Sequence, residues 1–489
     1  MGWALIAVLL VPLAAALVAV ADGWRAARAA TLVGGVAALA LAVALALEVS
    51  GGTTLRTAGG WMRLDALGAV FLLATALLYA AAAAFSIGYL AGRTDEHGFG
   101  RYARRYFALL NLFGWSMLAV PIAADFGTLW VAIELTTIVS ALLVAIDRTD
   151  AALEAAWKYV LIASSGLGIA LLAIILLYAS GTSGLGDAYV PRFDRLIGAA
   201  GSLSDDTVTL AFVLALVGFG TKAGFVPTHT WLPDAHSEAP APVSALLSGA
   251  LLAAAFYGVL RFFEVAIAAG NGDFARKVLV VFGAISLVAA ALFVLRQGNF
   301  KRLLAYSSIE HVGVIALGIG FGAPLAVGGA LLHVITHASA KGLAFFGTGA
   351  LLRRYDTKEV DGVTGAGRRL PWSGPMFLAA TLALSGLPLS GVFRSEFQIV
   401  SGGFQATDYV GVALLLVFVN LAFFGVIWHS GRMVLTPSAP GAVVGEQSWW
   451  MVAAMLGCLF VVVALGVHVP GDLQRLLDHA VARLQVPGS

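Results

Sequence analysis

The sequence has little charge, a single cysteine and no long polar segment. Only 11% of its 489 residues are charged and 60% are hydrophobic, which leaves too little polar surface to cover a soluble protein of this length. The one cysteine, Cys458, excludes a disulfide framework and any iron–sulfur site built from several cysteines. A net charge of +2 gives no indication of nucleic-acid binding. We therefore expect a multi-pass membrane protein.

The polar connections are also short. The longest, about 180–206 and 353–372, cannot hold a soluble domain, so redox or nucleotide chemistry has to come from a partner. We expect no cofactor in this chain. The first hydrophobic stretch lacks a basic leading segment and an Ala-x-Ala cleavage site, which indicates a retained helix rather than a signal peptide.

Hydrophobic stretches of about 20 residues, the length that crosses a bilayer, recur along the whole chain. They predict an all-α polytopic membrane fold with about fourteen transmembrane helices. The expected spans are 3–22, 29–49, 66–90, 106–123, 126–146, 156–179, 207–226, 240–268, 275–293, 303–322, 325–352, 373–401, 408–433 and 449–468.

Two of these predicted helices are interrupted. The apolar run 210–226 ends at Pro227, and the run that begins at 377 is interrupted by the segment GLPLSG at 386–391. Each is the fourth helix in a set of five, spans 4–8 and 9–13, and an odd number of helices inverts the second set relative to the first. The predicted segments are 1–105 (helices 1–3), 106–268 (first repeat), 269–433 (second, inverted repeat) and 434–489 (helix 14 and an amphipathic tail over 472–485).

Basic residues indicate the orientation. Odd-numbered loops carry Arg25, Arg28, Arg93, Arg101, Arg104, Arg105, Arg148, Arg296, Lys301, Arg302, Arg353, Arg354, Lys358, Arg368 and Arg369, whereas even-numbered loops carry only Arg56, Arg63, Arg192, Arg195, Arg276 and Lys277. The positive-inside rule places the odd loops in the cytoplasm and both termini outside, in a cell inner (cytoplasmic) membrane.

Two charges at membrane depth form the first candidate pair. Glu134 lies about ten residues from either end of its predicted helix, and Lys222 lies in the first interrupted helix. A lone charge at this depth costs about 3 kcal/mol, so each needs a partner or water. An ion pair that only joins helices is one interpretation. The other is proton transfer, because separating a Glu–Lys pair changes the proton affinity of both groups. Lys158, one turn beyond Glu154, fits an ordinary surface pair as well as a channel role.

A second group lies on one helix face. His333, His337 and Lys341 are spaced i, i+4, i+8. Neutral imidazole accepts a proton on one nitrogen while it donates from the other, which favours a hydrogen-bonded wire around Lys341. The alternative is that these polar side chains only form hydrogen bonds to one another inside the helix bundle. His311, with its neighbours Ser307, Ser308 and Glu310, extends this group toward the cytoplasm. Glu396 follows the second interruption, with Arg394 as either its counter-charge or an anchor at the interface.

The segment after the first interruption holds metal-ligand types at His229, Asp234, His236 and Glu238. Their spacing matches no compact motif, and two prolines and a tryptophan indicate a rigid turn, so we expect no metal site there. Water enters where a helix break frees backbone groups. The candidate proton-translocation residues are Glu134, Lys158, Lys222, His229, His311, His333, His337, Lys341 and Glu396.

Several segments of the chain resemble a known family. The segment 219–240, FGTKAGFVPTHTWLPDAHSEAP, closely resembles the signature of the antiporter-like subunits of respiratory complex I, energy-converting hydrogenases and multisubunit sodium/proton antiporters. NFKRLLAYSSI at 299–309 and LSGLPLSG at 384–391 support it. WVAIELTT at 130–137, followed by LEAAWKY at 153–159, is most similar to the F subunit of hydrogenase-4-type enzymes, and then to the M-type (ND4-like) subunit of complex I.

The resemblance implies a proton-translocating subunit that works with other membrane subunits and, indirectly, with a soluble redox arm. It implies that Glu134 and Lys222 form the family's glutamate–lysine pair, that Lys341 is its central lysine, that Glu396 is a terminal site and that Lys158 is a basic position in the linking helix. One departure is Ala253, where many M-type subunits carry a lysine, so that water or His333 and His337 would have to bridge the gap.

Four alternatives stay open. Sodium is a possible transported ion, and the resemblance also covers the membrane subunit of an inorganic-carbon accumulation complex. A haem-binding electron carrier would need a further histidine such as His311 or His429 opposite His333 or His337, because two histidines on one helix face cannot hold both sides of one haem. A membrane scaffold without transport is the fourth.

Overall fold

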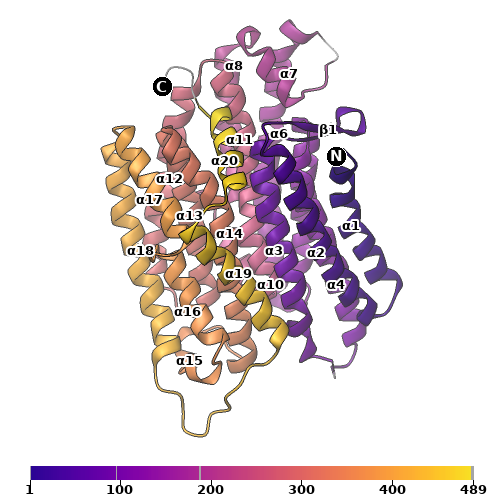
Figure 1. Ribbon diagram of the computed structural model, residues 1–489, viewed down its shortest axis with the longest axis vertical. Coiled ribbons are helices and arrows are strands. Elements are labelled where there is room, and N and C mark those ends of the chain that lie inside the picture. The colour runs from indigo at the N-terminus through magenta and orange to yellow at the C-terminus, as the bar shows by residue number, and fades with distance from the viewer. Residues whose placement is uncertain (1, 95, 187–188, 486–489) are drawn as a thin grey trace.

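The computed structural model describes residues 2–94, 96–186 and 189–485, and in these residues the only sheet is one short hairpin. The long helices run roughly along the long axis of the molecule (Figure 1). They are α1 (Gly2–Ala21), α2 (Trp24–Val49), α3 (Ala66–Ala91), α4 (Phe99–Ala119), α5 (Phe126–Val144), α6 (Asp150–Leu185), α8 (Asp205–Ala223), α11 (Leu252–Ala268), α12 (Gly272–Val294), α13 (Phe300–Phe321), α14 (Pro324–Tyr355), α16 (Ser373–Leu384), α17 (Gly391–Gln405), α18 (Tyr409–Leu435) and α19 (Trp449–Val467).

Short elements connect them. These are the strands β1 (Leu55–Thr57) and β2 (Met62–Leu64), the helices α7 (Phe193–Gly198), α9 (Trp231–Glu238), α10 (Ala241–Leu246), α15 (Ala366–Arg369) and α20 (Gly471–Arg483), the 3₁₀ turns η1 (Ala58–Gly60), η2 (Val120–Ile122), η3 (Ala200–Ser202) and η5 (Val360–Gly362), and the π-helical turn η4 (Leu247–Leu251).

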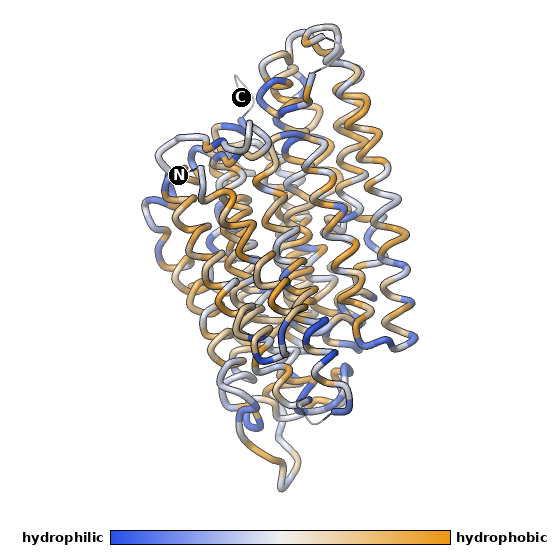
Figure 2. Tube along the Cα trace, turned by 90° about the vertical axis from the view of Figure 1, so that its right-hand side faces the viewer, coloured by the Kyte–Doolittle hydropathy of each residue, from blue (hydrophilic) through white to orange (hydrophobic). Residues whose placement is uncertain are grey.

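Twelve helices in the described residues are long and apolar enough to cross a membrane. Figure 2 shows hydrophobic residues along the helices and hydrophilic residues gathered toward the two ends. The chain is therefore a polytopic membrane protein, as predicted. Two further spans were predicted. One corresponds to α14, whose 32 residues reach about 48 Å but include two histidines and a lysine. The other corresponds to α16 and α17, each of which is short because the helix is broken between them.

Both predicted interruptions are present. Gly224 (φ 91°) ends α8, and Gly386 (φ 72°) follows α16; both have the left-handed conformation that glycine adopts without steric cost. The Ser390 hydroxyl then caps α17 by accepting a hydrogen bond from the Phe393 N–H at 3.1 Å. The π turn η4 is a third irregularity, which the sequence did not predict. The inverted relation of the two five-helix sets stays a prediction.

Helices at the centre of the molecule are almost wholly buried. The most apolar stretch is completely buried in α10–α11 and in α13. In α18 only about a third of the corresponding stretch is buried. Most of α14 is buried as well. Polar residues on α13 and α14 therefore lie inside the protein rather than against lipid.

The start of α1 and the helix α20 lie at the same end of the molecule, beside the β1–β2 hairpin (Figure 1). The predicted amphipathic tail corresponds to α20. It buries Leu476, Leu477, Ala480 and Val481 and leaves its charged face exposed.

Candidate functional site

A single threonine hydroxyl links Glu134 to Lys222. Glu134, on α5, accepts hydrogen bonds from Ser164 Oγ of α6 at 2.9 Å and from Thr137 Oγ1 at 3.3 Å. Lys222, fully buried near the end of α8, donates from Nζ to the same Thr137 hydroxyl and to Tyr159 OH at 3.0 Å. Among the described residues, the two charges are thus connected through this shared hydroxyl rather than by a direct salt bridge, and their role as a functional pair stays a prediction. A hydroxyl separates them because it can accept from the ammonium and donate to the carboxylate.

The helix break holds Lys222 in place. The Trp231 indole N–H, on α9, donates to the Thr221 carbonyl at 2.9 Å, and the Trp231 ring lies 4.5 Å from the Tyr159 ring. On the far side of the break, the Val226 N–H donates to Ser286 Oγ at 3.0 Å. Backbone groups freed by the break thus find partners, which a bilayer requires.

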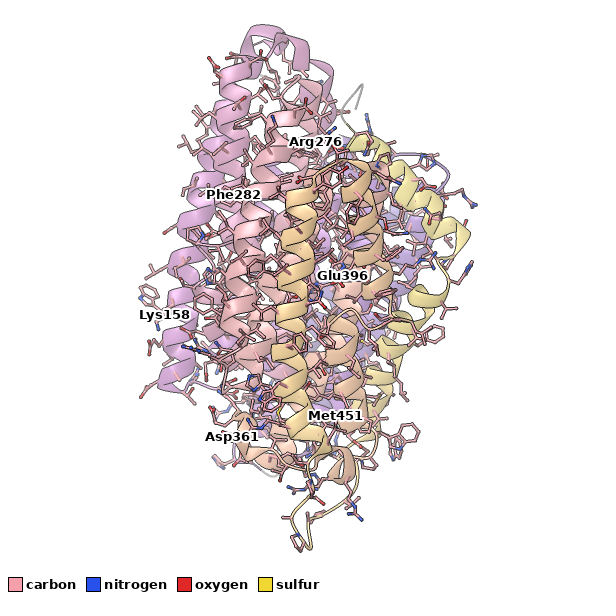
Figure 3. All side chains as sticks on the ribbon, turned by 90° about the vertical axis from the view of Figure 1, so that its left-hand side faces the viewer. Lys158, Arg276, Phe282, Asp361, Glu396 and Met451 are labelled. Atoms are coloured by element: carbon pink, nitrogen blue, oxygen red, sulfur yellow. The ribbon has the colours of Figure 1, made fainter. Side chains whose placement is uncertain are left out.

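Lys158 stands apart from this group. Its side chain is 47% exposed on the outer side of α6, where it pairs with Glu154 at 2.6 Å and Asp234 at 3.4 Å (Figure 3). Asp234 in turn pairs with Arg302 at 2.7 Å. These contacts correspond to the surface-pair interpretation of Lys158.

The segment after the first break does not converge on one point. His229 is buried, with its ring centre 6.2 Å from Phe293 and 6.4 Å from Tyr306. Glu238 pairs with Lys358 at 2.8 Å. Together with the Asp234 contacts, this means that the carboxylates tie α9 to α6, α13 and the segment after α14.

In the second half, three helices bring their candidates together. His311 Nδ1 (α13) lies 3.1 Å from His333 Nε2 (α14) and 3.7 Å from Glu396 Oε1 (α17). His333 Nδ1 lies 2.8 Å from Ser395 Oγ. The His337 ring centre is 4.8 Å from that of His311. Figure 3 places Glu396 near mid-height of the molecule, between Arg276 toward one end and Asp361 toward the other.

Lys341 is buried on the same helix as the two histidines and donates to the Leu304 carbonyl at 2.9 Å. Among the described residues it forms no ion pair with a carboxylate. Arg394 is half-buried, donates to the Val467 carbonyl at 3.4 Å and forms no ion pair among the described residues, which favours the anchor over the counter-charge of Glu396.

The described contacts of His333 and His337 are with His311 and Ser395. A bridge across the position of Ala253, by water or by these histidines, stays a prediction. Five residues before Ala253, Ser248 on η4 lies with its hydroxyl 2.7 Å from that of Ser308 on α13. A serine within an apolar helix is the sequence signal that could have found this contact, because the π turn itself cannot be read from the sequence.

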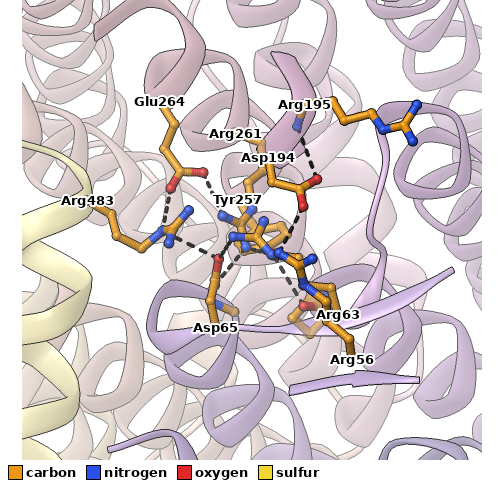
Figure 4. A network of polar contacts seen from close by, with 11 residues as sticks. Arg56, Arg63, Asp65, Asp194, Arg195, Tyr257, Arg261, Glu264 and Arg483 are labelled. Carbon is orange, nitrogen blue, oxygen red and sulfur yellow. Dashed lines mark hydrogen bonds and ion pairs between the residues drawn. The ribbon is translucent and has the colours of Figure 1, made fainter. Parts of the chain in front are cut away.

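Sequence reasoning also missed a buried charge network at the end of the molecule that holds α20 (Figure 4). Asp65 pairs with Arg261 at 2.8 Å and with Arg63 at 3.0 Å, while Glu264 pairs with Arg261 and with Arg483 of α20, both at 2.6 Å. Burial alone would raise the pKa of Asp65, but the surrounding arginines outweigh it and hold that pKa well below its usual range. The sequence signal for this network was the i, i+3 spacing of Arg261 and Glu264, which places the two charges on one helix face.

Comparison with known proteins identifies the family. Residues 123–425 match the transmembrane family described as NADH:quinone oxidoreductase/Mrp antiporter. The chain is 33% identical to a hydrogenase-4 component F homolog of Methylacidiphilum infernorum (isolate V4) over 87% of this chain and 89% of that protein. It is 32% identical to hydrogenase-4 component B of Escherichia coli (strain K12) over 73% of this chain, but it spans only 52% of that longer relative.

A subunit of the archaeal membrane-bound sulfane sulfur reductase has the same fold, with a TM-score of 0.87, 23% identity and coverage of 99% of this chain and 98% of that one. The chain belongs to the NADH:quinone oxidoreductase/Mrp antiporter family, and it is an antiporter-like membrane protein with buried charged residues.

Proposed function

We propose that this protein translocates protons as the antiporter-like membrane subunit of a hydrogenase-4-type or complex I-like assembly. Redox chemistry in a soluble arm supplies the energy, and the chain itself carries no redox centre. The observation that carries the proposal is the Glu134–Thr137–Lys222 contact next to a helix break. Charges held at this depth are costly, and a hydroxyl between them makes their separation adjustable.

The mechanism begins at this contact. When Lys222 moves toward Glu134, the direct pair stabilises the ionised carboxylate and the ammonium. When it moves away, burial favours the neutral forms, so Lys222 gives up a proton and Glu134 takes one up. The Lys222 ammonium changes partner by rotation of its side chain while α8 stays in place, because the Thr137 and Tyr159 hydroxyls are both within its hydrogen-bond reach. We assign the connection between the two halves of the route to Ser248 and Ser308, whose hydroxyls lie 2.7 Å apart.

In the second half, a proton passes from His333 Nε2 to His311 Nδ1 along their 3.1 Å contact and then to the Glu396 carboxylate, 3.7 Å from His311, while the Ser395 hydroxyl holds His333 at its other nitrogen. Lys341 supplies the charge that biases this step. An imidazole accepts on one nitrogen and donates from the other, so transfer needs only small movements. The proposed order of charges is Glu134, Lys222, Lys341 and Glu396, with His229 and His337 beside them and Lys158 at the surface.

The partners follow from the membrane setting. Other membrane subunits cover part of the lipid-facing surface, the arginine-rich loops face the cytoplasm, and both termini lie outside the cytoplasmic membrane. The two halves, 106–268 and 269–433, act as inverted repeats around the helix breaks.

The test is proton uptake by vesicles that contain the whole native complex. We expect Lys222→Ala to abolish uptake while the complex assembles at its normal level, and Lys158→Ala, at the surface, to change uptake less than twofold. Unchanged uptake in Lys222→Ala would contradict the proposal and favour a scaffold. Sodium uptake that survives a protonophore would identify sodium as the ion instead.

A further inference from the structure

Three buried side chains of metal-ligand type meet at one point. His311 Nδ1, His333 Nε2 and a carboxylate oxygen of Glu396 all lie within 4.8 Å of one another, and each comes from a different helix. This group is separate from the metal-ligand types at residues 229–238.

The spacing fits tetrahedral coordination. Two ligand atoms that each lie 2.0–2.1 Å from a zinc ion at the tetrahedral angle are about 3.3 Å apart. The observed separations from His311 Nδ1 are 3.1 Å to His333 Nε2 and 3.7 Å to Glu396 Oε1. Both separations are within about 0.4 Å of this value, and the third, between His333 Nε2 and the carboxylate oxygen, is at most 4.8 Å.

The surroundings orient the ligands. Ser395 Oγ lies 2.8 Å from His333 Nδ1, which leaves His333 Nε2 directed at the group. A metal-bound histidine commonly has such a partner on its other nitrogen. Glu396 Oε1 is buried and has no hydrogen-bond partner, so the carboxylate has an unused acceptor. An unpartnered buried acceptor is costly unless a proton or cation satisfies it.

The second helix break lies directly beside this group. A Cβ at Gly386 would stand 2.8 Å from Glu396 Oε2, so the carboxylate lies against the break. Leu387 and Leu389, in the same break, are 44% and 73% exposed. The remaining coordination position faces no fourth protein ligand among the described residues.

We propose that His311, His333 and Glu396 bind one zinc-class divalent cation, with three protein ligands and one open position. Two imidazoles select zinc, cobalt or nickel over magnesium and calcium. A bound ion ties α13, α14 and α17 together and occupies the groups assigned to proton transfer. Occupancy therefore slows translocation, a consequence that rests on the proposed function, whereas binding itself does not.

Cobalt(II) is the probe for binding, because tetrahedral cobalt with nitrogen and oxygen ligands has strong visible absorption. We expect one equivalent to bind the purified full-length protein and zinc to displace it. His311→Ala and Glu396→Gln should each weaken binding about tenfold or more, and Ser395→Ala should weaken it by a smaller factor although it removes no ligand. His468→Ala, at an exposed histidine, should bind like the unmodified protein.

Equal cobalt binding by the unmodified protein, His311→Ala and Glu396→Gln would overturn the site, as would the absence of tetrahedral absorption. Thermal unfolding midpoints of the variants show whether they are folded, and Ser395→Ala gives the readout if either ligand variant is not. Binding without zinc-dependent slowing of proton uptake in complex-containing vesicles would overturn the inhibition alone. A complex that does not pump protons would refute the proposed function and leave the cobalt result intact.

Discussion

The proposed first transfer step depends on one residue, Thr137, through its hydroxyl. It receives a hydrogen bond from Lys222 and gives one to Glu134, and these two residues are 88 positions apart in the chain (222 − 134). The sequence indicated both charges because a charge in an apolar helix is conspicuous. It did not indicate Thr137, since a threonine one turn from a glutamate is ordinary in any helix and only the fold brings Lys222 to it.

We expect Thr137→Val to lower the rate of proton uptake about tenfold in vesicles that contain the native complex. The substitution keeps the shape but removes a hydrogen bond to each of two charged groups, each of which contributes about 1.5–3 kcal/mol. Thr137→Ser retains the hydroxyl and should keep most of the rate. Equal rates in both variants would show that the hydroxyl is not required.

Asp65 gives a prediction about pH. Its pKa is lowered in the folded protein, mainly because the charges of Arg261, Arg63 and Arg483 outweigh the effect of burial. The ionised carboxylate therefore stabilises the fold above the unfolded pKa of about 4, and this contribution is lost as the pH falls below that value. Asp65→Asn leaves Arg63 without its ion-pair partner and Arg261 and Arg483 with Glu264 alone, and should cost about 3 kcal/mol at pH 7.

The measurement is the thermal unfolding midpoint in detergent at several pH values. The difference between Asp65→Asn and the unmodified protein should be constant from pH 7 to pH 5 and should shrink below about pH 4. Arg56→Gln is the matched control, because Arg56 forms a largely exposed pair with Asp194 at 2.8 Å. Surface pairs of this kind contribute at most about 1 kcal/mol. A difference that grows on acidification would contradict the assignment.

At the scale of elements, sequence signals found the breaks but not the π turn. Proline and glycine within an apolar run mark an interrupted helix directly, and both interruptions lie where these residues do. The turn η4 has no such signal. A Cβ at Gly249, inside it, would come within 2.6 Å of Leu78 and 3.0 Å of Ala338, so close packing against α3 and α14 accompanies the irregular turn. Packing partners this remote in sequence cannot be read from a local pattern.

Gly386→Ala should disturb both the second break and Glu396. The backbone there has φ 72°, which costs a residue with a Cβ about 1–2 kcal/mol, and the new methyl group would meet Glu396 Oε2 at 2.8 Å. We expect a lower unfolding midpoint and slower proton uptake. Gly457→Ala, at an open position on α19, should preserve both. An unaffected Gly386→Ala protein would show that the break tolerates a side chain.

At the scale of the whole molecule, the hydrophobic stretches predicted the membrane fold because burial in lipid imposes a simple pattern on every spanning helix. They did not predict which helices lie at the centre. The histidine-bearing α14 is interior, and its polar residues are what reduce its apparent suitability as a span. The histidines and the lysine were therefore the sequence signal that marked α14 as part of the proposed transport route.

The contact of α20 with the buried charge network has a consequence for how the protein is made. Arg483 is made 418 residues after Asp65 (483 − 65), yet it lies 3.4 Å from Asp65, near the start of α3, and pairs with Glu264 at 2.6 Å. Until α20 has been made, this corner of the protein lacks one of its three arginines. The synthesis of α20 therefore completes a charge network that begins at α3, and a translation product that stops before α20 would leave Asp65 and Glu264 with fewer partners.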